Sequence, residues 1–129
     1  MYPLQNRVIV ITGASGGMGR VLCRRLAQEG ALLALTSNDA PAMEALLKDL
    51  PQNTLTRVFD IADETKVAAF FAEIRETFGG ADALLNLAGL SIPAQIAEMR
   101  VEDYDLTMDV NLKGAFLASK HFAGVAREN

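Results

Sequence analysis

The chain has a single cysteine, no long apolar run and no excess of positive charge. Because Cys23 is the only cysteine among the 129 residues, an intrachain disulfide is impossible, and a reducing compartment such as the cytoplasm is expected. The longest apolar runs, such as residues 8–11 and 31–35, are far too short to cross a bilayer. Residues 1–7 carry one basic residue and are followed by no small-residue cleavage pattern, so we expect no secretory signal.

The formal net charge of −4 argues against a nucleic-acid partner, because phosphate backbones select basic surfaces, and it favours no membrane surface either. Half of the residues are hydrophobic and 22% are charged, which is typical of a globular protein with a core. No internal repeat or linker divides the chain, and no histidine, cysteine or carboxylate cluster has the spacing of metal ligands. We therefore expect one domain over residues 1–129, without a metal site.

Strand and helix patterns alternate along the chain. Short apolar runs, rich in β-branched residues, predict strands at residues 7–12, 31–36, 55–59 and 83–87. With Gly30 and Gly79 in terminating positions, apolar residues at helical spacing predict helices at residues 17–29, 41–50, 63–78, 101–108 and 112–128. This order predicts an α/β fold with a parallel sheet wound by right-handed crossovers.

A glycine-rich turn follows the first predicted strand, where residues 12–19 read Thr-Gly-Ala-Ser-Gly-Gly-Met-Gly. Between a strand and a helix, the backbone of such a turn can approach a pyrophosphate, whose charge the helix N-terminus stabilises. Gly13 permits the tight turn, Gly17 removes a Cβ that would block the phosphates, and Gly19 lets the helix pack close to the strand. Ser15 adds a hydroxyl donor. A glycine cluster alone is also compatible with a merely permissive loop, but the flanking strand and helix favour the phosphate site.

Three further motifs follow the turn, whose residues 12–19 contain the pattern Thr-Gly-x-x-x-Gly-x-Gly. Asp60 and Ile61 follow the third predicted strand, residues 86–89 read Asn-Leu-Ala-Gly after the fourth, and residues 109–114 read Asp-Val-Asn-Leu-Lys-Gly. These four motifs, in this order, resemble the short-chain dehydrogenase/reductase family. The resemblance extends from about residue 7 to the end of the chain.

The resemblance implies a Rossmann-like, doubly wound parallel sheet, of which this chain would build the strand order 3-2-1-4 and lack the family's strands 5–7. It also implies an NAD(P) dinucleotide as the ligand. The implied cofactor-binding residues are Gly13, Ser15, Gly17, Met18, Gly19, Ser37, Asn38, Asp60, Ile61, Asn86, Ala88 and Gly89. Two other interpretations stay open, namely Asp60 as a solvated strand-end acid and Asn86 as a simple turn former. Asn111 is the only member of the family's catalytic set present, and it is equally well a helix-kinking or capping residue.

The end of the second predicted strand bears on the choice between NAD and NADP. An acid there, about 20 residues beyond the glycine turn, would bind the ribose 2′-hydroxyl of NAD. This sequence has Ser37 and then Asn38, whose side chains could donate hydrogen bonds to a 2′-phosphate. Relatives that prefer NADP often carry arginine at the positions of Gly16 and Asn38, so that signature is also missing. The sequence favours NADP, with Asp39 just beyond as the argument for NAD.

The tyrosine and lysine that exchange the proton in the resembled family have no counterpart in this sequence. In the family a lysine lies four residues after the tyrosine and lowers its pKa. Neither Tyr2 nor Tyr104 has a lysine at that spacing. Residues 119–121, Ser-Lys-His, diverge by about 100° per residue around a helix and are expected to form a solvated face. Cys23 is expected to pack within the first helix rather than to act as a reactive thiol.

The sequence therefore predicts the N-terminal, cofactor-binding portion of an oxidoreductase that transfers hydride between a nicotinamide and a carbonyl or alcohol. We expect this portion to be a truncated form that is inactive alone. The alternative is a non-enzymatic dinucleotide-binding or sensor module completed by a partner chain. In either case the strand at residues 83–87 would expose an apolar edge, which predicts self-association or pairing with a partner.

Overall fold

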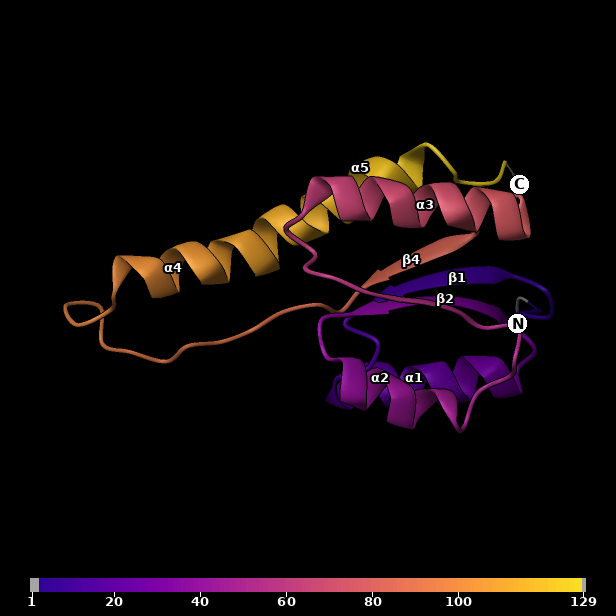
Figure 1. Ribbon diagram of the computed structural model, residues 1–129, viewed down its shortest axis with the longest axis horizontal. Helices are drawn as coiled ribbons and strands as arrows, with labels where there is room; N and C mark the ends of the chain where they lie inside the picture. Colours follow the sequence, from indigo (N-terminus) through magenta and orange to yellow (C-terminus); the bar gives the residue numbers. More distant parts are fainter. Residues whose placement is uncertain (1–2, 129) are drawn as a thin grey trace.

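A four-stranded parallel sheet forms the middle layer of the molecule (Figure 1). The computed structural model describes residues 3–128 and gives the strand order β3-β2-β1-β4, so the predicted incomplete Rossmann-like sheet is confirmed. The strands are β1 (Val8–Thr12), β2 (Leu32–Ser37), β3 (Leu55–Val58) and β4 (Ala83–Asn86). Thr12 is level with Thr36 of β2 and with Asn86 of β4, so the carboxyl ends of these three strands meet at one edge.

Helices cover both faces of this sheet, as a doubly wound fold requires. On one face lie α1 (Gly17–Gln28) and α2 (Ala40–Leu47), and on the other lie α3 (Glu64–Phe78) and α5 (Gly114–Ala123) (Figure 1). The helix α4 (Val101–Met108) and the π-helical turn η1 (Asp109–Lys113) run directly into α5. Among the helices of residues 3–128, none combines the length and the apolar character needed to cross a membrane.

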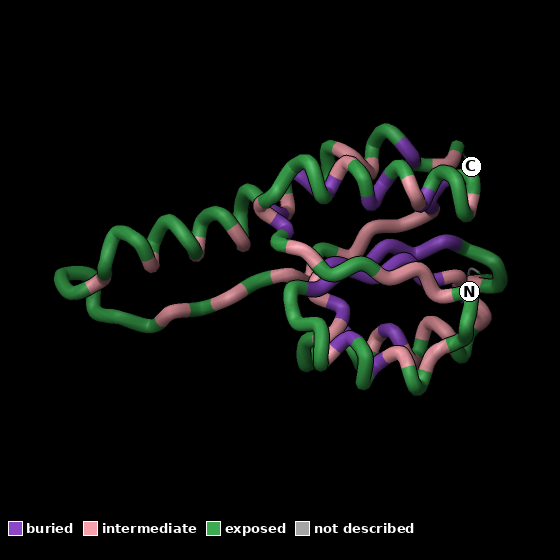
Figure 2. Tube along the Cα trace, viewed as in Figure 1, coloured by how far each residue is buried: buried purple, intermediate pink, exposed green. Residues whose placement is uncertain are grey.

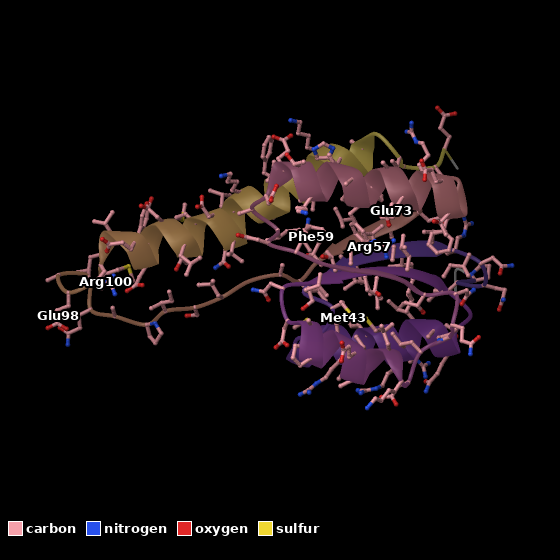
Figure 3. The ribbon with its side chains drawn as sticks, in the orientation of Figure 1. Met43, Arg57, Phe59, Glu73, Glu98 and Arg100 are labelled. Atoms are coloured by element: carbon pink, nitrogen blue, oxygen red, sulfur yellow. The ribbon has the colours of Figure 1, made fainter. Side chains whose placement is uncertain are left out.

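Two hydrophobic clusters, one on each face, hold the helices to the sheet. All five residues of β1 are buried, and successive side chains point to opposite faces. Ile9 and Ile11 pack with Cys23 of α1 and with Met43 of α2, which is labelled in Figure 3. On the other face, the cluster includes Val8, Val10, Val67, Phe70, Ile74 and Leu117. Figure 2 shows the buried residues gathered where the helices meet the sheet.

Local side chains and one glycine fix the ends of two helices. Asp63 caps α3 by accepting a hydrogen bond from the backbone N of Lys66 at 3.3 Å, and Gly79, with φ of +76°, ends it. The predicted cap and the predicted stop are both confirmed. Asp39 caps α2 in the same way, because its Oδ1 accepts from the backbone N of Ala42 at 3.0 Å. The sequence analysis did not predict this second cap.

The predicted helix over residues 112–128 is wrong at its C-terminal end. Its first residues belong to η1, and α5 ends at Ala123. The chain then runs beside the residues that precede β4, where the N–H of Ala81 donates to Val125 O and the N–H of Arg127 donates to Ala81 O, both at 2.9 Å. These long-range bonds leave no trace in helical periodicity. They also cover one end of the sheet edge that the sequence predicts to be open.

The segment of residues 91–108 extends from the body of the molecule as an arm (Figure 1). None of the residues of α4 is buried, and Figure 2 shows the arm as mainly exposed. Glu98 and Arg100 lie at its tip (Figure 3). Tyr104 lies on α4 within the arm, whereas Tyr2 lies outside the described residues.

Candidate functional site

A cavity of about 240 Å³ opens at the carboxyl ends of β1, β2 and β4. It lies at the point where strand order reverses about β1, which is where open α/β sheets bind ligands. The structure brings eight of the predicted cofactor-binding residues together in its lining: Gly13, Ser15, Ser37, Asn38, Asp60, Ile61, Ala88 and Gly89. The lining also contains Asp39, the argument for NAD, and residues to which the sequence analysis gave no binding role: Thr12, Gly16, Thr36, Phe59, Leu87, Leu90 and Val110. Each of these directly neighbours a predicted site residue, and that adjacency is the signal that could have identified them.

The glycines of the turn after β1 have three different environments. A Cβ on Gly13, where φ is +63°, would lie 2.6 Å from the backbone N of Ala88, so glycine lets this turn touch the turn after β4. A Cβ on Gly19 would collide with the carbonyls of Gly13 and Ala14. Gly19 thus allows α1 to pack on the turn itself, and the prediction that it packs on the strand is corrected. A Cβ on Gly17 would meet no described atom within 4 Å, so the space in front of it is open.

Thr12 links the end of β1 to the turn after β4, a role that the sequence analysis did not predict. Its side chain is buried, and its Oγ1 accepts hydrogen bonds from the backbone N of Leu87 at 3.1 Å and of Ala88 at 3.2 Å. One hydroxyl therefore satisfies two backbone donors that would otherwise be lost at the end of β4. The position of Thr12 at the last residue of β1 was visible in the sequence, but its partners depend on β4 lying beside β1.

Two serine hydroxyls, one from the end of β2 and one from the glycine turn, line the cavity. Ser37 is only 7% exposed, and its Oγ accepts a hydrogen bond from the backbone N of Asp39 at 3.1 Å. The same Oγ lies 2.5 Å from the Oγ of Ser15, which comes from the glycine turn. The carboxylate of Asp39 caps α2, as described above. Asp39, the residue that favours NAD in the sequence, thus has one of its two carboxylate oxygens hydrogen-bonded to the first turn of α2.

Asp60 and Ile61 form the wall that follows β3. The Oδ1 of Asp60 accepts from the backbone N of Ala62 at 2.9 Å, and Asp60 itself is exposed at the rim. Ile61 is buried and packs so closely against the start of α5 that a Cβ on Gly114 would lie 2.6 Å from its Cγ2. The wall is therefore held in place by α5. The adenine-binding role of both residues stays a prediction.

Asn86 and Asn111 lie outside the cavity lining and have structural partners. Asn86 donates from Nδ2 to the Oγ of Ser119 at 3.2 Å, which links β4 to α5. Asn111, in η1, accepts from the backbone N of Leu90 and donates to its O, both at 2.8 Å. This pair of hydrogen bonds fixes the loop after β4, and the neighbouring Val110 lines the cavity. Of the remaining predicted cofactor-binding residues, Gly17, Met18 and Gly19 begin α1 outside the lining.

Ser119 and Lys120 are exposed, as the predicted solvated face requires, but the expectation that consecutive side chains diverge is wrong for Lys120 and His121. Lys120 Nζ and His121 Nε2 lie 2.6 Å and 3.1 Å from the same Oε1 of Glu64, at the start of α3. The hydrogen bond from Lys120, followed by that from His121, holds the pKa of Glu64 below its ordinary value. Consecutive residues on a helix can meet one carboxylate because both side chains are long enough to reach it.

Cys23 is fully buried, as its packing interpretation predicts. Burial raises the pKa of its thiol to about 11, because the thiolate would lose its hydration. The thiol is therefore neutral and unreactive at physiological pH.

The residues around the cavity fit the adenosine and phosphate end of a dinucleotide. The hydroxyls of Ser37, at the end of β2, and of Ser15, on the glycine turn, lie side by side. An acid lies at the rim after β3, and the space before Gly17 is open to a phosphate. The cavity of about 240 Å³ lies below the range of about 300–1,000 Å³ that is usual for ligand pockets. It suits part of a dinucleotide better than the whole.

Comparison with known proteins gives a consistent result. The sequence family described as short chain dehydrogenase matches residues 7–126. The chain is 33% identical to meso-2,3-butanediol dehydrogenase of Serratia marcescens over 89% of its own length and 46% of that protein. It is 34% identical to levodione reductase of Leifsonia aquatica over 95% of its own length and 48% of that protein.

Solved structures agree with this result. A short-chain dehydrogenase/reductase of Brucella melitensis, described as a glucose/ribitol dehydrogenase, superposes with a TM-score of 0.93 at 31% identity, covering 98% of this chain and 55% of that one. The chain thus spans about half the length of the relatives it matches. With the four motifs, the sheet order and the family match in agreement, the chain belongs to the short-chain dehydrogenase/reductase family.

Proposed function

We propose that this chain is the cofactor-binding portion of an NAD(P)-dependent short-chain oxidoreductase and that it binds the adenosine and pyrophosphate end of the dinucleotide. The observation that carries the proposal is the cavity at the strand switch point, which the glycine turn and the ends of β2, β3 and β4 surround. The α1 N-terminus and the open space before Gly17 suit the pyrophosphate. Asp60 can accept a hydrogen bond from the adenine amine.

The proposed reaction of the complete enzyme is hydride transfer between the nicotinamide and an alcohol or carbonyl. When bound, the nicotinamide supplies or accepts the hydride. The names of the two relatives, a dehydrogenase and a reductase, support this reaction class. This chain contributes Asn111, a positioning residue that holds the loop at Leu90. Because it contains no Tyr-x-x-x-Lys sequence, we expect no turnover from the chain alone.

The preferred cofactor is NADP. Ser37 stands where an acid would select NAD, so no carboxylate at that position repels a 2′-phosphate. Asn38 also lines the cavity and offers an amide donor. No lysine or arginine is among the described lining residues, so the preference over NAD is expected to be modest.

The test is calorimetric titration of the 129-residue chain with NADP⁺ and NAD⁺, together with a Gly17→Asp variant. Aspartate in the first turn of α1 favours the helix, and a Cβ at this position meets no described atom within 4 Å, so the fold should persist. Its carboxylate would repel the pyrophosphate, and we expect binding at least about tenfold weaker. Gln28→Glu adds the same charge about 16 Å further along α1 and should leave the affinity unchanged.

Two results would contradict this proposal. The first is a wild-type chain that binds neither dinucleotide, and the second is a Gly17→Asp variant that binds as the wild type does. The expected inactivity is tested separately, by following NADPH absorbance with a panel of ketones and aldehydes. Turnover by the pure chain would show that its own residues suffice for catalysis.

A second candidate function is a non-enzymatic dinucleotide-binding or sensor module that a partner chain completes. The observation in its favour is the outer edge of β4, the last strand of the sheet, whose first three residues are only half-buried. Residues 125–127 cover the start of this edge alone. An exposed strand edge pairs readily with another strand, so we propose self-association or a partner strand at β4.

Sedimentation velocity over a wide range of protein concentration tests the pairing. Self-association through β4 predicts a dimer that forms as concentration rises, and added dinucleotide should raise the melting temperature of that form. A monomer at every concentration, with no shift of the melting temperature on adding dinucleotide, would exclude the module.

A further inference from the structure

The sheet has two outer strands, β3 and β4, and the side chains along their free edges differ. The sequence of β4 is Ala-Leu-Leu-Asn, whereas that of β3 is Leu-Thr-Arg-Val, so Arg57 is the one charged residue within Leu55–Val58 and Ala83–Asn86. The unpaired backbone groups of an outer strand are a template for another strand, and proteins often block them with a charged side chain. The position of Arg57 therefore bears on which edge can pair.

The backbone of β3 directs alternate residues toward β2 and toward solvent. The N–H of Phe59 donates to Ser37 O of β2 at 3.0 Å, so the backbone of Phe59 faces β2. Because successive residues of a strand direct their N–H and C=O groups to opposite sides, Arg57 also faces β2, whereas Thr56 and Val58 face away from it. The carbonyl of Thr56 thus lies on the outer edge, where a further strand would form its hydrogen bonds.

The side chain of Arg57 occupies this carbonyl. Its Nη1 donates to Thr56 O at 2.6 Å, and its Nη2 lies 2.6 Å from the Oε2 of Glu73 in α3, a pair that Figure 3 labels. This Oε2 is buried and has no hydrogen-bond partner among residues 3–128, so the guanidinium of Arg57 is the group that balances its charge. Because a guanidinium is planar and its donors have a fixed geometry, the carboxylate of Glu73 determines where Nη1 points.

We propose that Arg57, positioned by Glu73, closes the outer edge of β3 to pairing with a second copy of this chain. A strand that added there would displace the guanidinium from the Thr56 carbonyl and bury its charge beside the new backbone, which one backbone hydrogen bond does not offset. Within Ala83–Asn86, β4 has no such charged residue. The inference is independent of the nucleotide site, because Thr56, Arg57 and Glu73 lie outside the cavity lining.

The test is amide hydrogen exchange of the 129-residue chain at low and high protein concentration, measured by NMR at Thr56 and Val58. In the wild type, we expect these two N–H groups to exchange at the same rate at every concentration. Arg57→Thr removes the guanidinium and keeps a residue favoured in strands. Association should then slow the exchange of both amides by at least about tenfold once most chains are paired. Glu73→Gln keeps the shape of its side chain without the charge and should give the same change to a smaller extent.

Arg25→Gln is the control for the loss of a positive charge. Arg25 lies on α1, on the opposite face of the sheet from α3, and its side chain is exposed. Like Arg57→Thr, this variant makes the net charge of −4 more negative by one unit. It should leave the exchange of Thr56 and Val58 as in the wild type. Because added negative charge opposes self-association, pairing gained by Arg57→Thr must come from the opened edge.

Two results would overturn the proposal. The first is protection of Thr56 that rises with concentration in the wild type, because the edge would then pair despite Arg57. The second is exchange at Thr56 and Val58 that stays independent of concentration in both Arg57→Thr and Glu73→Gln. Protection of the β1 amides in the same spectra shows whether Arg57→Thr is folded, and if it is unfolded, Glu73→Gln alone decides. Association through β4 would protect residues 83–85 instead, so the two edges are distinguished in one experiment.

Discussion

Replacing Gly13 by alanine should destabilise the fold in two ways that can be measured separately. Alanine would have to adopt φ of +63°, a left-handed conformation that costs about 1–2 kcal/mol. Its Cβ would also lie 2.6 Å from the backbone N of Ala88 and 2.7 Å from the carbonyl carbon of Leu87. Because both neighbours are backbone atoms fixed by Thr12, relief requires movement of the turn after β4, at a further cost of about 1–3 kcal/mol.

Gly79→Ala is the matched control for this prediction. Gly79 has φ of +76°, and a Cβ there would meet no atom of residues 3–128 within 4 Å. The control therefore carries the conformational cost alone, about 1–2 kcal/mol, against about 2–5 kcal/mol for Gly13→Ala. Equilibrium urea unfolding followed by circular dichroism gives both values, since the chain has no tryptophan to serve as a fluorescent probe.

The difference between the two variants is the steric cost of placing a Cβ between the turns after β1 and β4. If Gly13→Ala and Gly79→Ala lose the same free energy of unfolding, the two turns do not touch as described. The reasoning about the shape of the cavity would then fail as well, because Gly13 and Ala88 both line it.

Three other predictions follow from buried polar groups. Thr12→Val removes the acceptor of two backbone N–H groups and should cost about 2–4 kcal/mol in urea unfolding, whereas Thr12→Ser should cost much less. Cys23, with its pKa raised to about 11, should resist alkylation at neutral pH until the protein unfolds; rapid labelling of the native chain would contradict its burial. Burial raises the pKa of Asp82, but hydrogen bonds from Val8 N and the Arg7 side chain, with the charge of Arg127, outweigh it, so the net pKa is lowered. The ionised Asp82 contributes its full stability above its ordinary pKa of about 3.9, and this contribution is lost as the pH falls below that value. In Asp82→Asn, the midpoint of urea unfolding should therefore decrease less on acidification than in the wild type.

The order of strands and helices could be predicted because it depends on neighbours in the sequence. The first four of the five buried residues of β1 form an uninterrupted apolar run, and Asp63 and Gly79 act within one turn of their own helix. The end of α5 could not be predicted, because it depends on hydrogen bonds between residues 125–127 and Ala81. No pattern within α5 records those bonds.

The residues of the candidate site also fall into two groups, those that sequence motifs identify and those whose role they do not identify. Gly13, Ser15 and Ser37 were identified by their positions in motifs at strand ends, and the structure places all three in one cavity. The two-fold acceptor role of Thr12 and the capping role of Asp39 were not identified. Thr12 needs β4 beside β1, whereas the Asp39 cap is local, three residues from Ala42, and is as visible in the sequence as the Asp63 cap.

The sequence by itself determined the α/β class, the family resemblance and the absence of the Tyr-x-x-x-Lys pair, because composition, periodicity and motif spacing are properties of the chain alone. Only the tertiary structure decided which polar groups meet. It placed Ser15 against Ser37, set the Thr12 hydroxyl against the turn after β4, and joined Lys120 to Glu64. The physical reason is that a hydrogen bond requires approach to within about 3 Å, and for groups distant in sequence that approach is set by strand order and register.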